Sequence, residues 1–226
     1  MESCKAWVKA LLGERLLAPW WAFRKWCERR VKNLRRMGLR TREFTVISNN
    51  CWSGLVYESY GLEKQSPTVG AYFAPEEYLR FLSDLKHYLT ECEMEFVRPE
   101  DARHKALYMC DKRFGTFPIA RVGDVEIAML HYHSEAEARE KWHRRCKRVN
   151  WDRLLVKMND QNGCTREQAA AFGKLPFAKK VFFTVHDWDG GEQTVRLPYG
   201  GEFVLSTQEP FGDSRYLDVN QLINGL

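Results

Sequence analysis

Short, largely apolar runs alternate with helix-length amphipathic segments along most of this 226-residue chain. Residues 44–47 form the first run and are followed by a helical pattern at 52–62, and residues 68–73 form the second and are followed by one at 75–90. Strands that are each followed by a helix are typical of parallel sheets whose faces are covered by helices. The alternation therefore predicts a single α/β domain with a largely parallel, Rossmann-like sheet.

The alternation continues toward the C-terminus. Ser134 and Glu137 have the spacing of a capping box and predict a helix that ends near Val149. Thr165 predicts the start of a shorter helix, ending near Gly173. The other elements that we expect are strands at 117–122, 124–133, 154–158, 180–185, 194–197 and 202–204, and a final helix at 219–223.

The positive charge of the chain is concentrated in its first 42 residues. They hold twelve Lys and Arg and three Glu, a net charge of +9, whereas the remainder holds 23 basic and 27 acidic residues, a net charge of −4. A nucleic-acid-binding domain carries its basic residues on the domain itself. We therefore divide the chain into a basic arm, residues 1–42, and an α/β domain, residues 43–226, and expect no nucleic-acid partner.

The arm combines its charge with large apolar rings. Trp7, Trp20, Trp21, Phe23 and Trp26 lie among Arg and Lys in a helical pattern that is broken near Gly13 and at Pro19. Rings on one side of a helix and cations on the other are typical of a helix that lies on an anionic membrane surface. Docking on the domain or on a second subunit is the alternative.

Cysteine spacing and hydropathy bear on the compartment. The seven cysteines are widely spaced and form no C-x-x-C pair, so we expect reduced thiols. No apolar stretch approaches the ~20 residues that span a bilayer, and no signal-peptide pattern is present. These features predict a cytoplasmic protein that is peripherally associated with the inner face of the cell membrane.

Polar side chains follow three of the predicted strands. In open parallel sheets ligands bind beyond the carboxyl ends of the strands, so Asn50, Asp160 and His186 mark a candidate cleft. The first of these ends leads into a helix, whose free N–H groups can hold a phosphate, although a simple capped junction is the alternative. The residues that we expect to bind substrate are Ser48, Asn49, Asn50, Trp52, Ser53, Gly54 and Lys157.

Three residues are candidates for general-base catalysis. Asp160 or His133 can deprotonate an acceptor hydroxyl, and His131 lies two residues before His133. Both histidines continue the apolar face of the predicted strand 124–133, so core histidines are the alternative. Asp124 and Glu126 share the other face, as a carboxylate pair or as partners of basic residues. Lys157 can reach a phosphate, pair with a carboxylate, or extend from a sheet edge.

Asp187 and Asp189 form a D-x-D pattern after a strand. Such a pair can hold a divalent cation against a diphosphate, because carboxylate oxygens are the ligands that hard cations prefer. Gly190 and Gly191 follow directly, so a plain turn is the alternative. A divalent cation is the only cofactor that the sequence indicates.

Three long blocks carry a family resemblance: ISNNCWSGLVYESYGLEKQSPTVGAYF, GDVEIAMLHYHSEAEAREKWHRR and NWDRLLVKMNDQNGC. They resemble a bacterial family of exopolysaccharide-biosynthesis proteins that has no assigned catalytic residues. The resemblance extends from about Phe44 to the C-terminus and leaves out the arm. It implies a cytoplasmic role in making capsule or exopolysaccharide beside glycosyltransferases.

Together these features predict a glycosyltransferase-type transferase that uses a nucleotide-activated sugar and a membrane-linked acceptor. Other polysaccharide-biosynthesis proteins are the expected partners. A non-catalytic protein that binds a glycan or scaffolds the assembly machinery is the alternative, and a hydrolase or acyl-type transferase is a third class.

Overall fold

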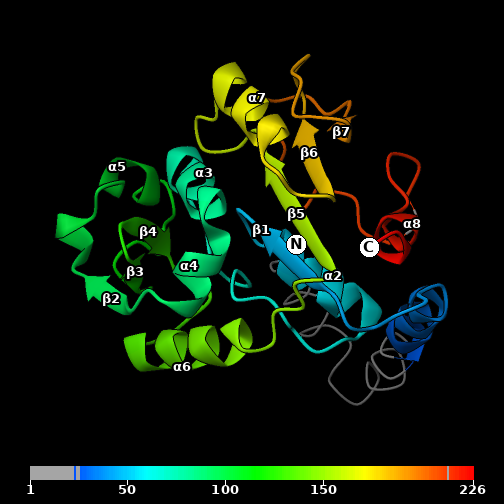
Figure 1. Cartoon of the computed structure of the whole chain (residues 1–226), viewed down its shortest axis with the longest axis horizontal. Helices are drawn as coiled ribbons and strands as arrows, with labels where there is room; N and C mark the ends of the chain where they lie inside the picture. The colour runs from blue at the N-terminus through cyan, green and yellow to red at the C-terminus, as the bar shows by residue number, and fades with distance from the viewer. Residues whose placement is uncertain (1–22, 24–25, 213) are drawn as a thin grey trace, which may run out of the picture.

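A four-stranded parallel sheet forms the centre of the protein (Figure 1). The computed structural model describes residues 23, 26–212 and 214–226. The sheet order is β1 (Thr45–Ser48), β5 (Leu154–Asn159), β6 (Lys180–Thr184) and β7 (Thr194–Arg196), and every neighbouring pair is parallel. The predicted α/β architecture with a largely parallel sheet flanked by helices is confirmed.

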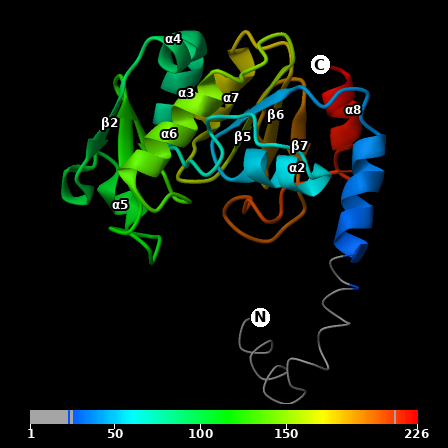
Figure 2. The same ribbon diagram turned by 90° about the horizontal axis from the view of Figure 1, so that it is seen from below.

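Helices cover both faces of this sheet (Figure 2). One face packs against α3 (Pro75–Ser83) and α7 (Arg166–Lys174), and the other against α2 (Trp52–Tyr60) and α8 (Val219–Asn224). Successive strand residues alternate between the two cores, as a period of two requires. Ile47, Val156, Met158 and Phe182 belong to the first core, and Val46, Leu155, Val181 and Phe183 to the second.

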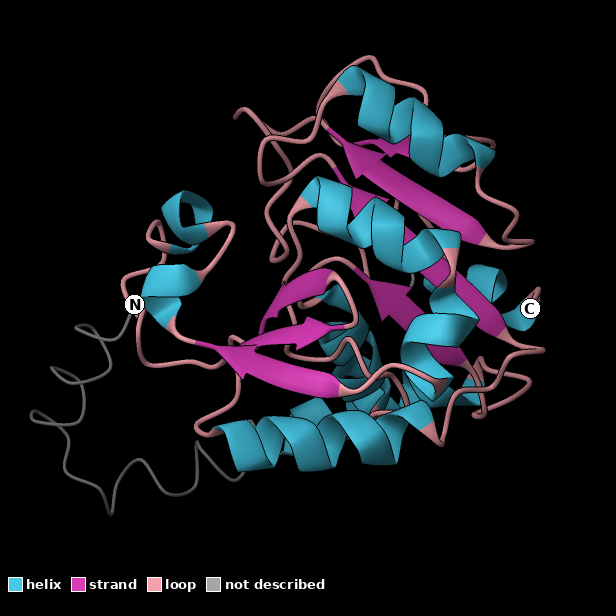
Figure 3. Cartoon of the chain, turned by 60° about the vertical axis from the view of Figure 1, so that its left-hand side comes forward, coloured by secondary structure: helices cyan, strands magenta, loops and turns pink. Residues whose placement is uncertain are grey.

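A second, antiparallel sheet lies between β1 and β5 in the chain (Figure 3). Its order is β2 (Met94–Val97), β3 (Ile119–Val122) and β4 (Val125–Ala128). Gly123, with φ +58°, occupies the turn between β3 and β4. The helix α6 (Glu135–Cys146) follows this sheet, and Ser134 caps it by accepting from the N–H of Glu137 at 3.2 Å. The Glu137 carboxylate accepts from the N–H of His133, so half of the predicted capping box is present, and the helix ends three residues before Val149. The predicted start at Thr165 is also confirmed, by a capping box in α7.

The prediction of a parallel strand at 68–73 is wrong. Tyr72 forms a single antiparallel bridge with Ala128, and the N–H of Phe73 donates to the carbonyl of Asn49 at 3.0 Å. The segment thus divides its hydrogen bonds between the two sheets and connects β4 to β1. Gly70, with φ +79°, turns the chain into this position.

Other predicted boundaries differ because of local geometry. The expected helix 75–90 is interrupted at Asp84, whose φ of −143° and ψ of 55° are not helical, and it continues as α4 (Leu85–Thr90). The strand expected at 124–133 ends at Ala128, and residues 202–204 form no strand. The short helices η1 (Pro99–Asp101) and α5 (Lys105–Tyr108) were not predicted.

Residues 26–37 are helical and their C-terminal end contacts the domain. The N–H of Arg40 donates to Asn224 at 2.7 Å, and the Asn224 amide donates to the carbonyl of Gly38 at 2.8 Å. The guanidinium of Arg35 lies 5.4 Å from the ring centre of Phe211. The predictions for Trp7, Trp20, Trp21 and the helix breaks concern residues 1–22, outside the described residues. Within the described chain, no helix combines the length and hydropathy needed to cross a bilayer.

Candidate active site

A cavity of about 1010 Å³ opens beyond the carboxyl ends of β1 and β5. It lies between the parallel sheet, the loops around α5 and β4, and the C-terminal tail. Its lining residues include Asn50, Cys51, Tyr72, Tyr108, Asp111, Lys112, Arg113, His131, Gln161, Asn162, Phe203 and Ser206. This is the position that the strand-end rule for parallel sheets indicates.

The polar residues at the ends of β1 and β5 contact one another. The Asn49 amide donates to the side-chain oxygen of Asn159 at 2.8 Å, and the Asn159 amide donates to the carbonyl of Val204 at 2.9 Å. The Asn50 amide donates to Glu209 at 3.2 Å and to Gln161 at 3.4 Å. The predicted substrate-binding residues Asn49 and Asn50 therefore share one network, and Asn50 also lines the cavity.

Lys157 pairs with a carboxylate, which was one of its three expected roles. Its ammonium forms an ion pair with Glu209 and donates to Asn50 at 2.9 Å and to Asn49 at 3.2 Å. Neither charged side chain is exposed, and burial raises the pKa of Glu209 and lowers that of Lys157. Sequence reasoning missed Glu209, because it lies in a tail without a helix or strand pattern.

The carboxylate of Asp160 binds two backbone N–H groups from other segments of the chain. Its two carboxylate oxygens accept from the N–H of Val204 at 2.7 Å and from the N–H of Val185 at 2.8 Å. It is 3% exposed and does not line the cavity. This geometry gives no support to the predicted role of Asp160 as a catalytic base.

The junction between β1 and α2 is capped by its own side chains. The N–H of Trp52 donates to the Asn50 side chain, and the N–H of Ser53 donates to the Ser48 hydroxyl, both at 3.1 Å. These two amides were expected to hold a phosphate. Trp52 lies in the core between the parallel sheet and helices α2 and α8. A Cβ added to Gly54 would lie 3.2 Å from the side chain of Val69. Neither residue lines the cavity.

The strand β4 ends at Ala128, before the two candidate histidines. His131 and His133 are both exposed, and Tyr132 between them is buried. Their predicted place on the apolar face is therefore wrong. His131 lines the cavity, with its Nε2 3.1 Å from the Cys51 sulfur. Partial burial, with smaller effects of Arg113 and Lys64, lowers the pKa of His131. His133 donates its N–H to Glu137 at 2.9 Å and is not part of the cavity lining.

Cys51 lies inside the segment that sequence reasoning selected, but it was not chosen. It is the N-cap residue of α2, and burial and the nearby Glu209 raise the pKa of its thiol, while Lys157 and Arg113 act in the opposite direction. Arg113 is held beside the cavity by Asp111, at 2.7 and 3.1 Å. Cys51 and His131 are eighty residues apart in the sequence, and no local sequence pattern predicts that they lie close together.

The D-x-D pattern lies away from the cavity. Asp189 accepts from the N–H of Gly191 at 2.8 Å, and the carbonyl of Asp187 accepts from Arg166 at 3.0 Å. His186 stacks on Trp188 with ring centres 4.2 Å apart. The turn was the alternative interpretation, and its hydrogen bond is present. Among the described residues, no group of three or more His, Cys, Asp or Glu could hold a metal ion.

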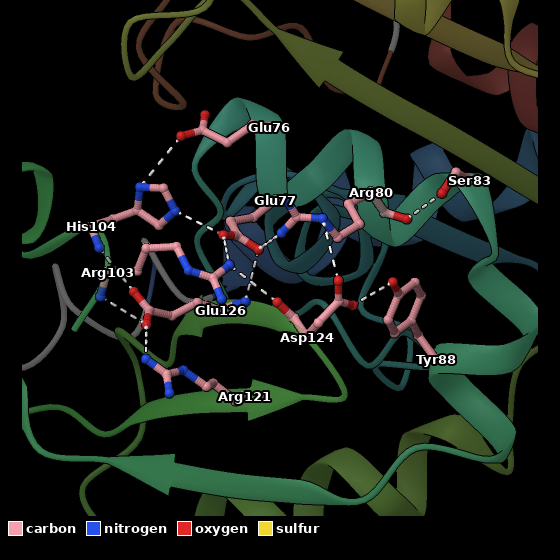
Figure 4. A network of polar contacts seen from close by, with 10 residues as sticks. All are labelled: Glu76, Glu77, Arg80, Ser83, Tyr88, Arg103, His104, Arg121, Asp124 and Glu126. Atoms are coloured by element: carbon pink, nitrogen blue, oxygen red, sulfur yellow. Dashed lines mark hydrogen bonds and ion pairs between the residues drawn. The ribbon is translucent and has the colours of Figure 1, made fainter. Parts of the chain in front are cut away.

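A second polar network connects α3 to the antiparallel sheet (Figure 4). Buried Glu77 accepts from Arg80, Arg103, His104 and the N–H of Glu126, at 2.5 to 3.0 Å. Buried Glu126 accepts from the N–H groups of Arg103 and His104, at 2.9 and 3.0 Å.

The carboxylates of Asp124 and Glu126 therefore do not act as a pair. Asp124 accepts from the hydroxyl of Tyr88 at 2.7 Å, and Glu126 lies 3.3 Å from Arg121. Each is bound to other partners, as the alternative interpretation expected.

Comparison with known proteins identifies relatives without an assigned function. Residues 22–199 match a family described as "Domain of unknown function (DUF1919)". An uncharacterized protein of Haemophilus influenzae is 35% identical over 146 residues, which cover 65% of this chain and 64% of that protein. The chain thus spans slightly less than two thirds of that relative. The family match includes part of the arm and ends before the tail, and neither match mentions exopolysaccharide.

Proposed function

The chain belongs to the DUF1919 family, and we propose that it is a transferase of surface-polysaccharide biosynthesis that binds a nucleotide-activated sugar. The observation that carries this proposal is the cavity of about 1010 Å³ beyond the carboxyl ends of β1 and β5. Rossmann-like sheets bind nucleotides at this edge. The pathway itself is proposed from the sequence blocks that resemble exopolysaccharide-biosynthesis proteins.

The lining of the cavity suits an anionic sugar. The amide of Gln161 can bind hydroxyl groups, and the rings of Tyr72 and Phe203 offer apolar faces to a sugar or a base. Lys112 and Arg113 are the cations of the lining, and guanidinium groups bind phosphate oxygens through charge-assisted hydrogen bonds. We place the diphosphate at Arg113 and the sugar beside Gln161.

His131 replaces His133 and Asp160 as the proposed base. It lines the cavity, and its lowered pKa keeps the imidazole neutral at pH 7. A neutral imidazole can take the proton from a substrate hydroxyl while the hydroxyl oxygen forms its bond to the transferred group.

The helical residues 26–37 support a membrane-linked substrate. Trp26, Leu34 and Met37 are 53%, 66% and 79% exposed, although each is large and apolar. Arg29 and Arg30 are exposed on the same helix. Exposed apolar side chains beside cations suit an anionic bilayer surface. We therefore propose that the protein works at the inner face of the cell membrane.

Calorimetric titration with a panel of nucleotide-activated sugars tests the proposal. We expect binding to the wild-type protein, and about tenfold weaker binding after Arg113→Gln, because one charge-assisted phosphate contact is lost. Lys174→Gln, at an exposed cation on α7, is the matched control and should not change the affinity. Absence of binding for every compound would rule out the proposed ligand. Binding without any transfer to polysaccharide intermediates would favour a glycan-binding accessory protein.

A further inference from the structure

A thiol and an imidazole meet at the wall of the cavity. The sulfur of Cys51 lies 3.1 Å from Nε2 of His131, and both residues line the same space of about 1010 Å³. Cys51 is also the N-cap residue of α2, a helix of nine residues. A base within hydrogen-bond reach of a nucleophile is the geometry of covalent catalysis.

We propose that Cys51 is a covalent nucleophile, that His131 is its base, and that the group transferred in this cavity is an acyl group. This inference rests on the proposed transferase function and specifies its chemistry. Thiolates attack carbonyl carbons, and the resulting thioester is readily cleaved by an oxygen nucleophile. The acceptor is then a hydroxyl group of the nucleotide-activated sugar, and the donor is an acyl ester or thioester.

Both half-reactions balance with the groups present. In the first, the Cys51 sulfur forms a bond to the carbonyl carbon, the bond from that carbon to the leaving group breaks, and His131 passes the thiol proton to the leaving group. In the second, the sugar hydroxyl attacks the thioester carbon and the carbon–sulfur bond breaks. His131 takes the hydroxyl proton and returns it to the thiol. No oxidant or reductant is required.

The charges around the pair determine its resting state. Burial and Glu209 raise the thiol pKa, against the opposing effects of Lys157 and Arg113. Burial, Arg113 and Lys64 lower the pKa of His131, against the effect of Asp111. Both groups are therefore neutral at pH 7, and the proton moves only during the attack.

A second thiol–imidazole pair provides a matched control. The sulfur of Cys92 lies 3.2 Å from Nε2 of His87, whose Nδ1 lies 3.1 Å from Glu91. Both cysteines are half-buried, but Cys92 and His87 are not part of the cavity lining. Equal reactivity of the two pairs would show that proximity alone activates a thiol in this protein.

The test is reaction of the full-length protein with p-nitrophenyl acetate, followed by release of p-nitrophenolate and by mass spectrometry of peptides. We expect a burst of about one equivalent, with the acetyl group on Cys51. Cys51→Ser should abolish the burst, and Cys92→Ser should leave it unchanged. His131→Gln should slow acetylation of Cys51 by about 100-fold, the usual contribution of a general base, whereas His87→Gln should not. Unchanged melting temperatures would show that the variants are folded.

The pH profile separates this role from simple thiol reactivity. The wild-type rate should rise through the lowered pKa of His131 and then remain level, whereas the His131→Gln rate should keep rising with pH across the accessible range, because it follows ionisation of a thiol whose pKa is raised by burial. Acetylation of Cys51 no faster than that of Cys92, or a rate unaffected by His131→Gln, would overturn the inference. Because the ester needs no sugar, this result is independent of the titrations that test the proposed ligand.

Discussion

Lys157 and Glu209 form a fully buried ion pair between a central strand and the C-terminal tail. Asn50 donates to the same carboxylate, and Lys157 donates to Asn50 in turn. The pair therefore connects the tail to the ends of β1 and β5, next to the cavity. Removing one member of a buried pair leaves a charge without compensation, which usually costs more than the intact pair contributes.

Lys157→Met should lower the free energy of unfolding by about 3–5 kcal/mol, because Glu209 would remain buried and unpaired. The double variant Lys157→Met, Glu209→Leu should recover most of this loss. Urea unfolding measures both effects, with the exposed Lys174→Met as the control. Equal losses in the single and double variants would contradict the compensating role of the pair.

Glu77 makes the stability depend on pH. Burial alone would raise its pKa, but hydrogen bonds from His104, the N–H of Glu126 and Arg103 lower the pKa below its ordinary value of 4.5 (Figure 4). A lowered carboxyl pKa contributes stability that is fully present above the unfolded-state value and is lost as the pH falls through the folded-state value.

We therefore expect the wild-type protein to lose stability between pH 4.5 and the lowered pKa of Glu77. Glu77→Gln should be less stable at pH 7 and should show a smaller loss over this range. Glu76→Gln, at a half-exposed neighbour, should behave like the wild type. Denaturation at a series of pH values provides the comparison, and an unchanged slope in Glu77→Gln would assign the pH dependence to other groups.

At the scale of elements, the predictions succeeded where the information was local. The strands β1, β5 and β6 are apolar runs, and the caps at Ser134 and Thr165 are short motifs. The segment 68–73 has the same composition as a strand, but its partners lie in two different sheets. A period of two indicates a strand without identifying its neighbours.

The residues of the candidate site likewise divide into those that a local pattern predicts and those that it does not. The strand-end rule placed Asn50 correctly, because parallel strands end at one edge and the cavity opens there, but Asp160 and His186 do not line the cavity. Cys51, Arg113 and Glu209 reach this edge from a cap, a loop and the tail, where no periodic pattern marks them. Their roles depend on contacts between distant segments, which a single sequence does not contain.

The helical residues 26–37 expose an apolar surface, and we expect it to bind anionic vesicles. Each apolar side chain that enters the bilayer interface should strengthen vesicle binding by about tenfold. This apolar contribution to the binding free energy should not decrease at high salt. Replacing Trp26, Leu34 and Met37 with Ser should weaken the salt-resistant part, whereas Arg29→Gln with Arg30→Gln should weaken the salt-sensitive part. Co-sedimentation with vesicles at low and high salt measures both. If the wild-type protein does not co-sediment with anionic vesicles, a membrane role is contradicted.

At the scale of the whole molecule, the cavity depends on three parts of the chain. The parallel sheet provides Asn50 and Gln161, the antiparallel unit and its loops provide Arg113 and His131, and the tail provides Phe203. The tail lies beyond the residues that match the family. The site is therefore a property of the assembled fold, and a ligand bound there would contact all three parts.

A crystal structure of the protein soaked with a nucleotide-activated sugar tests this account most directly. It should show the sugar and its diphosphate in the cavity, with the diphosphate at Arg113 and the sugar within hydrogen-bond distance of Gln161. The hydroxyl that accepts the group should lie near His131. A ligand bound instead at the shallow hollow beside Arg166, Trp188 and Asp189 would contradict the account, because the cavity would then not be the substrate site.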